Sequence, residues 1–260
     1  MHHVTSADGT RIACTRTGSG PALLLVHGTT ADHHSWSGVT RHFARHFTVY
    51  AMDRRGRGES GPVSQTDPSR EAADVAAVVD SIGAPVDVLG HSYGAICALE
   101  AARLTGRIRR LVLYEPPIPT GLPMYPAGAP ERLRALIDRG QWEDALVFFY
   151  LEVMLMPADE LAAYRRRSSW QRRIPLAPTI PAEIQFDRTY RFDPAAFTHL
   201  PTPTRLLLGG ASPDLYRRAV DRVASALPNA SVVELPGQRH VAMGTHPALF
   251  VREVLGFLLT

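Results

Sequence analysis

Residues 86–94, VDVLGHSYG, decide how this sequence is interpreted. Val86 to Leu89 is a short apolar run typical of a buried strand, and the apolar residues of 92–104 recur at helical spacing. Between them, residues 90–94 match G-x-S-x-G, which places a serine on a tight turn from a strand into a helix. Such a turn exposes the hydroxyl, and the helix N-terminus directs backbone N–H groups at developing negative charge. The stretch therefore predicts Ser92 as a nucleophile.

Strand-like and helix-like segments alternate on both sides of this turn, which predicts a mostly parallel sheet flanked by helices. The other expected strands are residues 2–5, 11–17, 22–26, 47–52, 110–114, 204–208 and 231–235. The first two of these form a hairpin, because an Asp-Gly pair at residues 8–9 is a strong turn signal. The expected helices include residues 69–82, 130–139, 142–156, 213–226 and 247–259.

The alternation lapses between residues 117 and 200, which look helical and are interrupted by prolines. We therefore expect one core domain in two pieces, residues 1–116 and 201–260, and a helical cap at residues 117–200 that shapes the pocket. The cap carries much apolar surface, which either packs against the core or lines an apolar acyl or aromatic pocket. This surface comes from Trp142, Phe148, Phe149, Tyr150, Met154 and Met156.

The overall composition narrows the class of protein. The chain has 260 residues, 45% of them hydrophobic and 20% charged, enough for a sizeable core. Its 28 basic residues are all arginine and are scattered, so the net charge of +3 does not indicate a nucleic-acid partner. No apolar run reaches the roughly 20 residues of a membrane span, and no signal peptide, cofactor fingerprint or metal-ligand spacing is visible. We expect a cytoplasmic monomer or homodimer without cofactor or metal.

A serine hydroxyl needs a base to take its proton, and His240 is the best candidate. It lies in a polar loop that carries Gly237 and follows the last expected strand, from which it reaches back over the sheet edge. The neighbouring His246 precedes Pro247 and is expected to cap the last helix instead.

A tetrahedral intermediate also needs N–H donors for its oxyanion. Tyr93, directly after the nucleophile, supplies one such amide, and the loop after residues 22–26 supplies the other. In that loop, Thr29 is placed to donate while His27 packs at the strand end.

Together these features resemble the α/β-hydrolases of the small esterase, lipase and C–C hydrolase kind. The resemblance is carried by His27-Gly28, by residues 52–60 (MDRRGRGES), by the turn around Ser92 and by residues 237–240. It implies an eight-stranded sheet with a helical cap after the sixth strand, and a structural turn at residues 53–60. Serine at residue 92 argues against an epoxide hydrolase or a haloalkane dehalogenase, which resemble this fold but have aspartate there.

The acid that orients the histidine stays open between two residues. The family's usual position, after the seventh strand, falls here on Ser212, which carries no charge; Asp214 lies two residues later at a helix start. The alternative is the end of the sixth strand, where Glu115 is fixed by two prolines. We favour Glu115 over Asp214, and a dyad without an acid is the third possibility.

The leading functional prediction is an esterase-like serine hydrolase of EC class 3.1, acting on a small-molecule ester, thioester or related carbonyl with an apolar portion. A thioesterase or cyclase, a C–C bond hydrolase and a ligand-binding member without covalent catalysis are the alternatives. Arginines cluster at residues 165–173 and either steer an anionic substrate or form the solvated end of a helix that acids begin at residues 159–160.

Overall fold

The computed structural model describes residues 1–62, 67–188 and 190–260, and in this part of the chain eight strands form one sheet in the order β1-β2-β4-β3-β5-β6-β7-β8. Strands β1 and β2 pair antiparallel, as does β2 with β4, and every other neighbouring pair is parallel. The predicted fold class and its N-terminal hairpin are confirmed. The strands are β1 His2–Thr5, β2 Arg11–Thr17, β3 Ala22–Val26, β4 Thr48–Asp53, β5 Val86–His91, β6 Ile108–Tyr114, β7 Thr204–Gly209 and β8 Ala230–Leu235.

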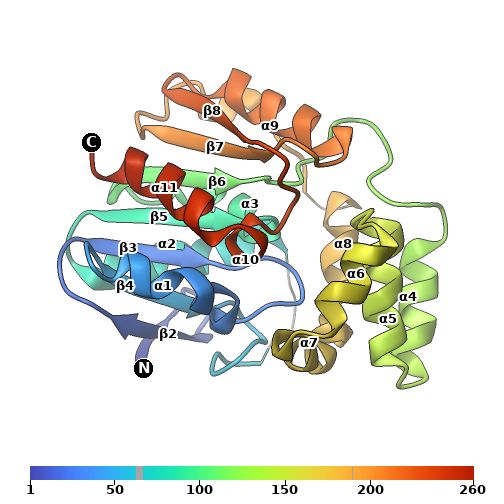
Figure 1. Ribbon diagram of the computed structural model, residues 1–260. Helices are drawn as coiled ribbons and strands as arrows, with labels where there is room; N and C mark the ends of the chain where they lie inside the picture. The colour runs from blue at the N-terminus through green and yellow to red at the C-terminus, as the bar shows by residue number, and fades with distance from the viewer. Residues whose placement is uncertain (63–66, 189) are drawn as a thin grey trace.

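Helices cover both faces of the sheet (Figure 1). Strand β3 is buried along its whole length because both faces are covered, which is why its sequence is apolar without alternation. One apolar layer joins the sheet to α2, α3 and α9, and the other joins it to α1, α10 and α11. These helices are α1 Ser37–Phe43, α2 Pro68–Ile82, α3 Tyr93–Ala101, α9 Asp214–Ala226, α10 Ala242–Thr245 and α11 Pro247–Leu258.

The segment between β6 and β7 is helical and stands together beside the sheet (Figure 1). It contains α4 Ala129–Asp138, α5 Trp142–Phe148, α6 Ala158–Arg165, α7 Ser168–Arg173 and α8 Ile180–Ile184. It also has an apolar cluster of its own, with Leu133, Leu146 and Trp170 at its centre. We call residues 117–200 the insertion.

Two expected helices of the insertion differ from the structure. The helix expected at residues 142–156 ends at Phe148 and continues as a π-helical turn, Phe149–Val153. The helix expected to run from the acids at 159–160 to the arginines of 165–173 is two helices, because Arg167 is extended, with φ −79° and ψ 144°. The serines that follow favour helix starts over helix interiors, which accounts for the break.

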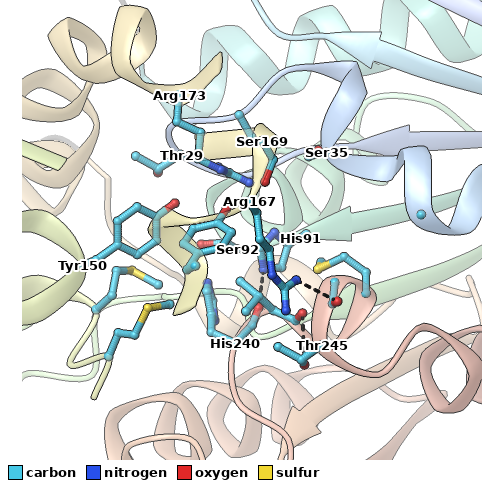
Figure 2. A pocket seen from close by; sticks show the side chains of 18 of the residues that line it. Thr29, Ser35, His91, Ser92, Tyr150, Arg167, Ser169, Arg173, His240 and Thr245 are labelled. Atoms are coloured by element: carbon cyan, nitrogen blue, oxygen red, sulfur yellow. Dashed lines mark hydrogen bonds between the residues drawn. The ribbon is translucent and has the colours of Figure 1, made fainter. Parts of the chain in front are cut away.

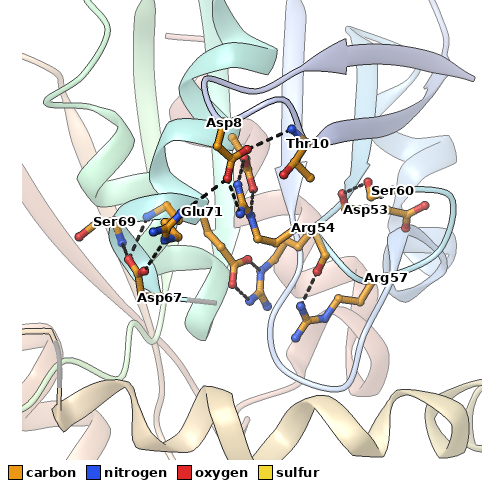
Figure 3. Close-up of polar contacts among 12 residues, drawn as sticks. Asp8, Thr10, Asp53, Arg54, Arg57, Ser60, Asp67, Ser69 and Glu71 are labelled. Carbon is orange, nitrogen blue, oxygen red and sulfur yellow. Dashed lines mark hydrogen bonds and ion pairs between the residues drawn. The ribbon is translucent and has the colours of Figure 1, made fainter. Parts of the chain in front are cut away.

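A buried ion-pair network ties the insertion to the sheet. Arg54, in the turn after β4, donates to Glu71 of α2 over 2.6 and 2.9 Å (Figure 3). The same guanidinium and that of Arg57 both pair with Glu183 of α8. All four side chains are at most 1% exposed. Two cations and two carboxylates thus neutralise one another where α2, the turn and α8 meet.

We expect Glu183→Ala to lower the free energy of unfolding by about 3–5 kcal/mol, because it leaves two buried guanidinium groups with too little negative charge. The measurement is urea unfolding followed by circular dichroism. Arg218→Ala is the matched control, because its partner Asp214 is 64% exposed, and the loss of an exposed pair costs about 1 kcal/mol or less. Equal losses in the two variants would contradict a role for the network in joining the insertion to the sheet.

Candidate active site

Ser92 stands in a strained turn between β5 and α3, with φ 55° and ψ −128°. Its N–H donates to the carbonyl of Tyr114 over 2.9 Å, which fixes the turn against β6. Gly94 has to be glycine here, because a Cβ atom would overlap the backbone carbonyl oxygen of His27. A non-glycine residue in this backbone region costs about 1–3 kcal/mol and persists where its surroundings force it. The strain is of the kind found at nucleophile turns.

His240 and Glu115 are hydrogen-bonded in the interior. The Nδ1–H of His240 donates to Oε2 of Glu115 over 2.5 Å, and the glutamate is fully buried. The other oxygen, Oε1, accepts the N–H of Gly209 over 2.6 Å. Glu115 also has a left-handed backbone, with φ 46°. Since Nδ1 carries the proton and donates it in a hydrogen bond to the carboxylate, the Nε2 lone pair of His240 is the basic position.

The loop that carries His240 is fixed from three sides. His91 donates from Nε2 to the backbone carbonyl of His240 over 2.7 Å. The hydroxyl of Tyr114 donates to the carbonyl of Arg239, and the ring of Tyr216 stacks on the imidazole at 4.5 Å between centroids. Within the described part of the chain, Nε2 of His240 is buried and has no hydrogen-bond partner. The imidazole is therefore held with one nitrogen free to act.

The two candidates for the acid occupy different environments. Asp214 begins α9, where its carboxylate is 64% exposed and pairs with Arg218 one turn later over 2.5 Å. This is the helix-start position that its sequence context suggested. Of the two residues, the structure brings only Glu115 to His240.

The loop after β3 places Thr29 beside the serine, since both residues line the same cavity. The next residue, Thr30, is left-handed with φ 56°. Two side chains of the insertion hold it: Arg173 donates from Nη1 to the carbonyl and hydroxyl of Thr30 over 2.7 and 3.1 Å, and the Tyr150 hydroxyl lies 3.0 Å from that hydroxyl. The positions of Arg173 and Tyr150 were not predicted, because nothing local in the sequence links them to Thr30.

The turn at residues 53–60 has the structural character that its resemblance implied. Asp53 accepts the N–H groups of His33 and Glu59 over 2.8 and 3.0 Å, and so holds the turn to the loop after β3. His27 packs beneath it, accepting the N–H of Arg54 at Nε2 over 3.1 Å. His246 accepts the N–H of Leu249, which makes it the helix cap that was expected.

The Ser92 region opens into a cavity of about 310 Å³, which we call the large cavity. Its walls include His240 and, from the insertion, Phe149, Tyr150, Met154 and Met156 (Figure 2). Trp142 by contrast is 39% exposed, and Phe148 lies under Arg132 at 4.8 Å. The expected apolar surface thus divides between the cavity and the exterior.

The arginine run at residues 165–173 divides in the same way. Arg165 pairs with Glu143 over 2.8 Å at the surface. Arg167 and Arg173 instead line the large cavity, so the run is not one solvated face. The described residues contain no group of three or more potential ligands placed to hold a metal ion, and none of their helices is long and apolar enough to cross a bilayer.

Comparison with known proteins identifies the family. A sequence model of the alpha/beta hydrolase family matches residues 23–253, and the chain belongs to this family. A crystal structure of an alpha/beta hydrolase from Sphaerobacter thermophilus is 34% identical with a TM-score of 0.86, and the match covers 99% of this chain and 100% of that one.

Curated relatives match over a shorter stretch. The chain is 37% identical over 131 residues to N-formylmaleamate deformylase of Pseudomonas putida, which is 48% of this chain and 49% of that protein. It is 36% identical over 118 residues to the probable oxidoreductase EphD of Mycobacterium tuberculosis, covering 43% of this chain and 20% of that protein. The matches thus span between a fifth and a half of these relatives.

We expect His27 and His91 to stay neutral on mild acidification. Burial lowers the pKa of His27 to about 3, and burial together with the charge of His240 lowers the pKa of His91 well below its usual value. Because the unfolded chain then binds protons that the folded chain does not, stability falls as the pH drops below about 6.5. For His27 the slope approaches about 1.4 kcal/mol per pH unit.

Urea unfolding of the wild type and of His27→Asn between pH 7.5 and 5 measures this slope. The asparagine variant retains an N–H donor near the Nδ1 position and should show the shallower dependence on pH. Parallel slopes would show that His27 titrates in the folded protein.

Proposed function

We propose that this chain is a serine hydrolase in which Ser92, His240 and Glu115 form the catalytic triad. The observation that carries the proposal is the 2.5 Å contact between Glu115 and Nδ1 of His240, which leaves Nε2 unpartnered and places the imidazole in a cavity that Ser92 also lines. Ser92 has the backbone strain of a nucleophile turn and begins a helix at its N-terminal end.

In the proposed mechanism, Nε2 of His240 takes the proton of the Ser92 hydroxyl as its oxygen attacks the substrate carbonyl. The resulting oxyanion accepts the N–H groups of Tyr93 and Thr29. Glu115 stabilises the imidazolium through Nδ1–H without taking its proton. When the tetrahedral intermediate collapses, His240 gives the proton to the leaving group. In the second half of the reaction, His240 takes a proton from water as the water attacks the acyl group, and then returns the proton to the Ser92 oxygen as the acid product leaves.

The insertion is proposed to act as a cap that excludes water and selects the substrate. Its apolar side chains supply much of the lining of the large cavity, which favours a small-molecule substrate with an apolar portion. Likeness to a deformylase keeps amide-type acyl bonds beside esters and thioesters among the proposed substrates. A thioesterase or cyclase and a C–C hydrolase would use the same triad, and a purely ligand-binding member would not need an activated serine.

We expect wild-type protein to hydrolyse p-nitrophenyl acetate, and Ser92→Ala to lower kcat by about 10⁶-fold. Glu115→Gln should lower kcat by about 10⁴-fold, because the imidazole loses the charge that fixes its tautomer. Asp214→Asn is the matched control and should retain the wild-type rate. If Asp214→Asn lost activity and Glu115→Gln retained it, the acid of the triad would be Asp214 and not Glu115.

Labelling with a fluorophosphonate tests the nucleophile independently of substrate preference. We expect wild-type protein to gain one covalent adduct, detected by intact-mass spectrometry and located at Ser92 by peptide mapping. Ser92→Ala should remain unlabelled, because it lacks the hydroxyl that His240 is proposed to activate. Failure of the wild type to react would favour the ligand-binding alternative.

A further inference from the structure

Two cavities meet at Ser92. Beside the large cavity lies a second one of about 50 Å³, which we call the small cavity. Thr29 and Ser92 line both, and Phe149 and Met154 separate them from the side of the insertion. A substrate whose carbonyl carbon reaches Ser92 can therefore place its acyl group in one cavity and its leaving group in the other.

The position of His240 indicates which cavity holds the leaving group and which holds the acyl group. The imidazole lines the large cavity and is absent from the walls of the small one. In acyl transfer, the histidine that deprotonates the serine must protonate the leaving group, so the leaving atom has to lie within hydrogen-bond reach of Nε2. The leaving group accordingly belongs in the large cavity and the acyl group in the small cavity.

The small cavity suits a short apolar acyl group. Most of its lining is apolar and includes Pro117, Val153, Ile184 and Leu215. Glu183 also lines it; one oxygen of its carboxylate is paired with Arg54 and Arg57, and the other is buried without a hydrogen-bond partner among the described residues. With about 50 Å³ available, long acyl chains do not fit without rearrangement.

Two arginines of the insertion line the large cavity without a salt bridge to any described carboxylate. Arg173 is half-buried; it donates to the neutral carbonyl and hydroxyl of Thr30, and its guanidinium lies 5.5 Å from the centre of the Tyr164 ring. Arg167 donates to the carbonyl of Gly244 over 3.0 Å. Among the described residues neither guanidinium forms a salt bridge, and the electrostatic interactions of Arg173 with Asp32 and of Arg167 with Glu160 act over longer distances. Arg167 is exposed, but a partly buried cation such as Arg173 is costly without a salt bridge, and a ligand anion would supply one.

One carboxylate lines the same cavity, but it belongs to another pair. Glu160 lies 3.8 Å from Nε of Arg239, and burial raises its pKa. At the Arg173 end, the wall also includes the hydroxyl-bearing residues Ser35 and Ser169 (Figure 2). Arginine with neighbouring hydroxyls is a donor set suited to a carboxylate.

We propose that the substrate joins a short acyl group to a larger leaving group that carries a carboxylate, and that Arg173 binds this carboxylate. This proposal rests on the proposed serine mechanism, because the role of His240 in that mechanism decides where the acyl group and the leaving group lie. Arg173 is then a specificity-determining residue, in addition to holding Thr30 in the loop that carries the oxyanion donor.

The test compares 4-acetoxybenzoate with 4-acetoxybenzamide, which share the acetyl group and differ in the charge of the leaving group. The ratio of their kcat/KM values is measured for wild type, Arg173→Met, Arg173→Lys and Arg172→Met. Taking the ratio cancels any general loss of activity from a loosened Thr30 loop. Arg172 is exposed and does not line the large cavity, which makes it the matched control.

We expect wild-type protein to prefer the carboxylate, and Arg173→Met to lower the preference by about 10- to 100-fold, mainly through KM. Arg173→Lys should retain part of it, and Arg172→Met all of it. An unchanged ratio in Arg173→Met would overturn the assignment. It would leave the serine mechanism standing, because 4-acetoxybenzamide turnover and fluorophosphonate labelling report on that separately.

The acyl side is tested with p-nitrophenyl esters from acetate to decanoate. The small cavity predicts that kcat/KM is highest for acetate to butyrate and falls steeply for longer chains. A maximum at octanoate or decanoate would show that the acyl chain occupies the large cavity. It would overturn the placement of the acyl group in the small cavity.

Discussion

The carboxylate of Glu115 is the constraint on which the rest of the site depends. Its two oxygens join three segments that are far apart in the sequence: Oε1 holds the end of β7 at Gly209, and Oε2 holds His240 in the loop after β8. The residue itself directly follows β6, whose last residue, Tyr114, accepts the N–H of Ser92 at its carbonyl. A fully buried acid is tolerated only when its charge is satisfied, and here both oxygens have donors. The left-handed backbone at Glu115 is the strain that accompanies this position.

The site is also completed from outside the sheet. Arg173 and Tyr150 belong to the insertion, yet they hold the strained Thr30 next to Thr29. The guanidinium of Arg54 lies 4.3 Å from the centre of the ring of Tyr93, the residue after the nucleophile. The same guanidinium is paired with Glu183 of the insertion. The insertion therefore contributes to the geometry of the proposed oxyanion hole as well as to the walls of the cavity.

Local sequence patterns were enough to predict the fold and the positions of Ser92 and His240 in it. A strand, a G-x-S-x-G turn and a helix are encoded within 20 residues, so short-range rules apply to them. Glu115 was favoured over Asp214 because a charged residue at the end of an apolar strand needs a partner, and the structure supplies that partner as His240. Arg173 and Glu183 could not be placed, because their partners are more than 100 residues away and the insertion has no strand pattern to fix its register. The π-helical turn after Phe148 was missed for a different reason: the helical periodicity of the apolar residues continues through it.

The insertion is attached unevenly to the rest of the molecule. Moving α8 away would separate Glu183 from two buried guanidinium groups, at a cost of about 3–5 kcal/mol. Where α6 and the residue before α7 meet the His240 loop and α10, the polar contacts among the described residues include the 3.8 Å pair of Glu160 with Arg239 and the hydrogen bond from Arg167 to the carbonyl of Gly244. Contacts of this kind are worth about 1 kcal/mol or less each. The insertion is therefore held more weakly at this contact than at α8.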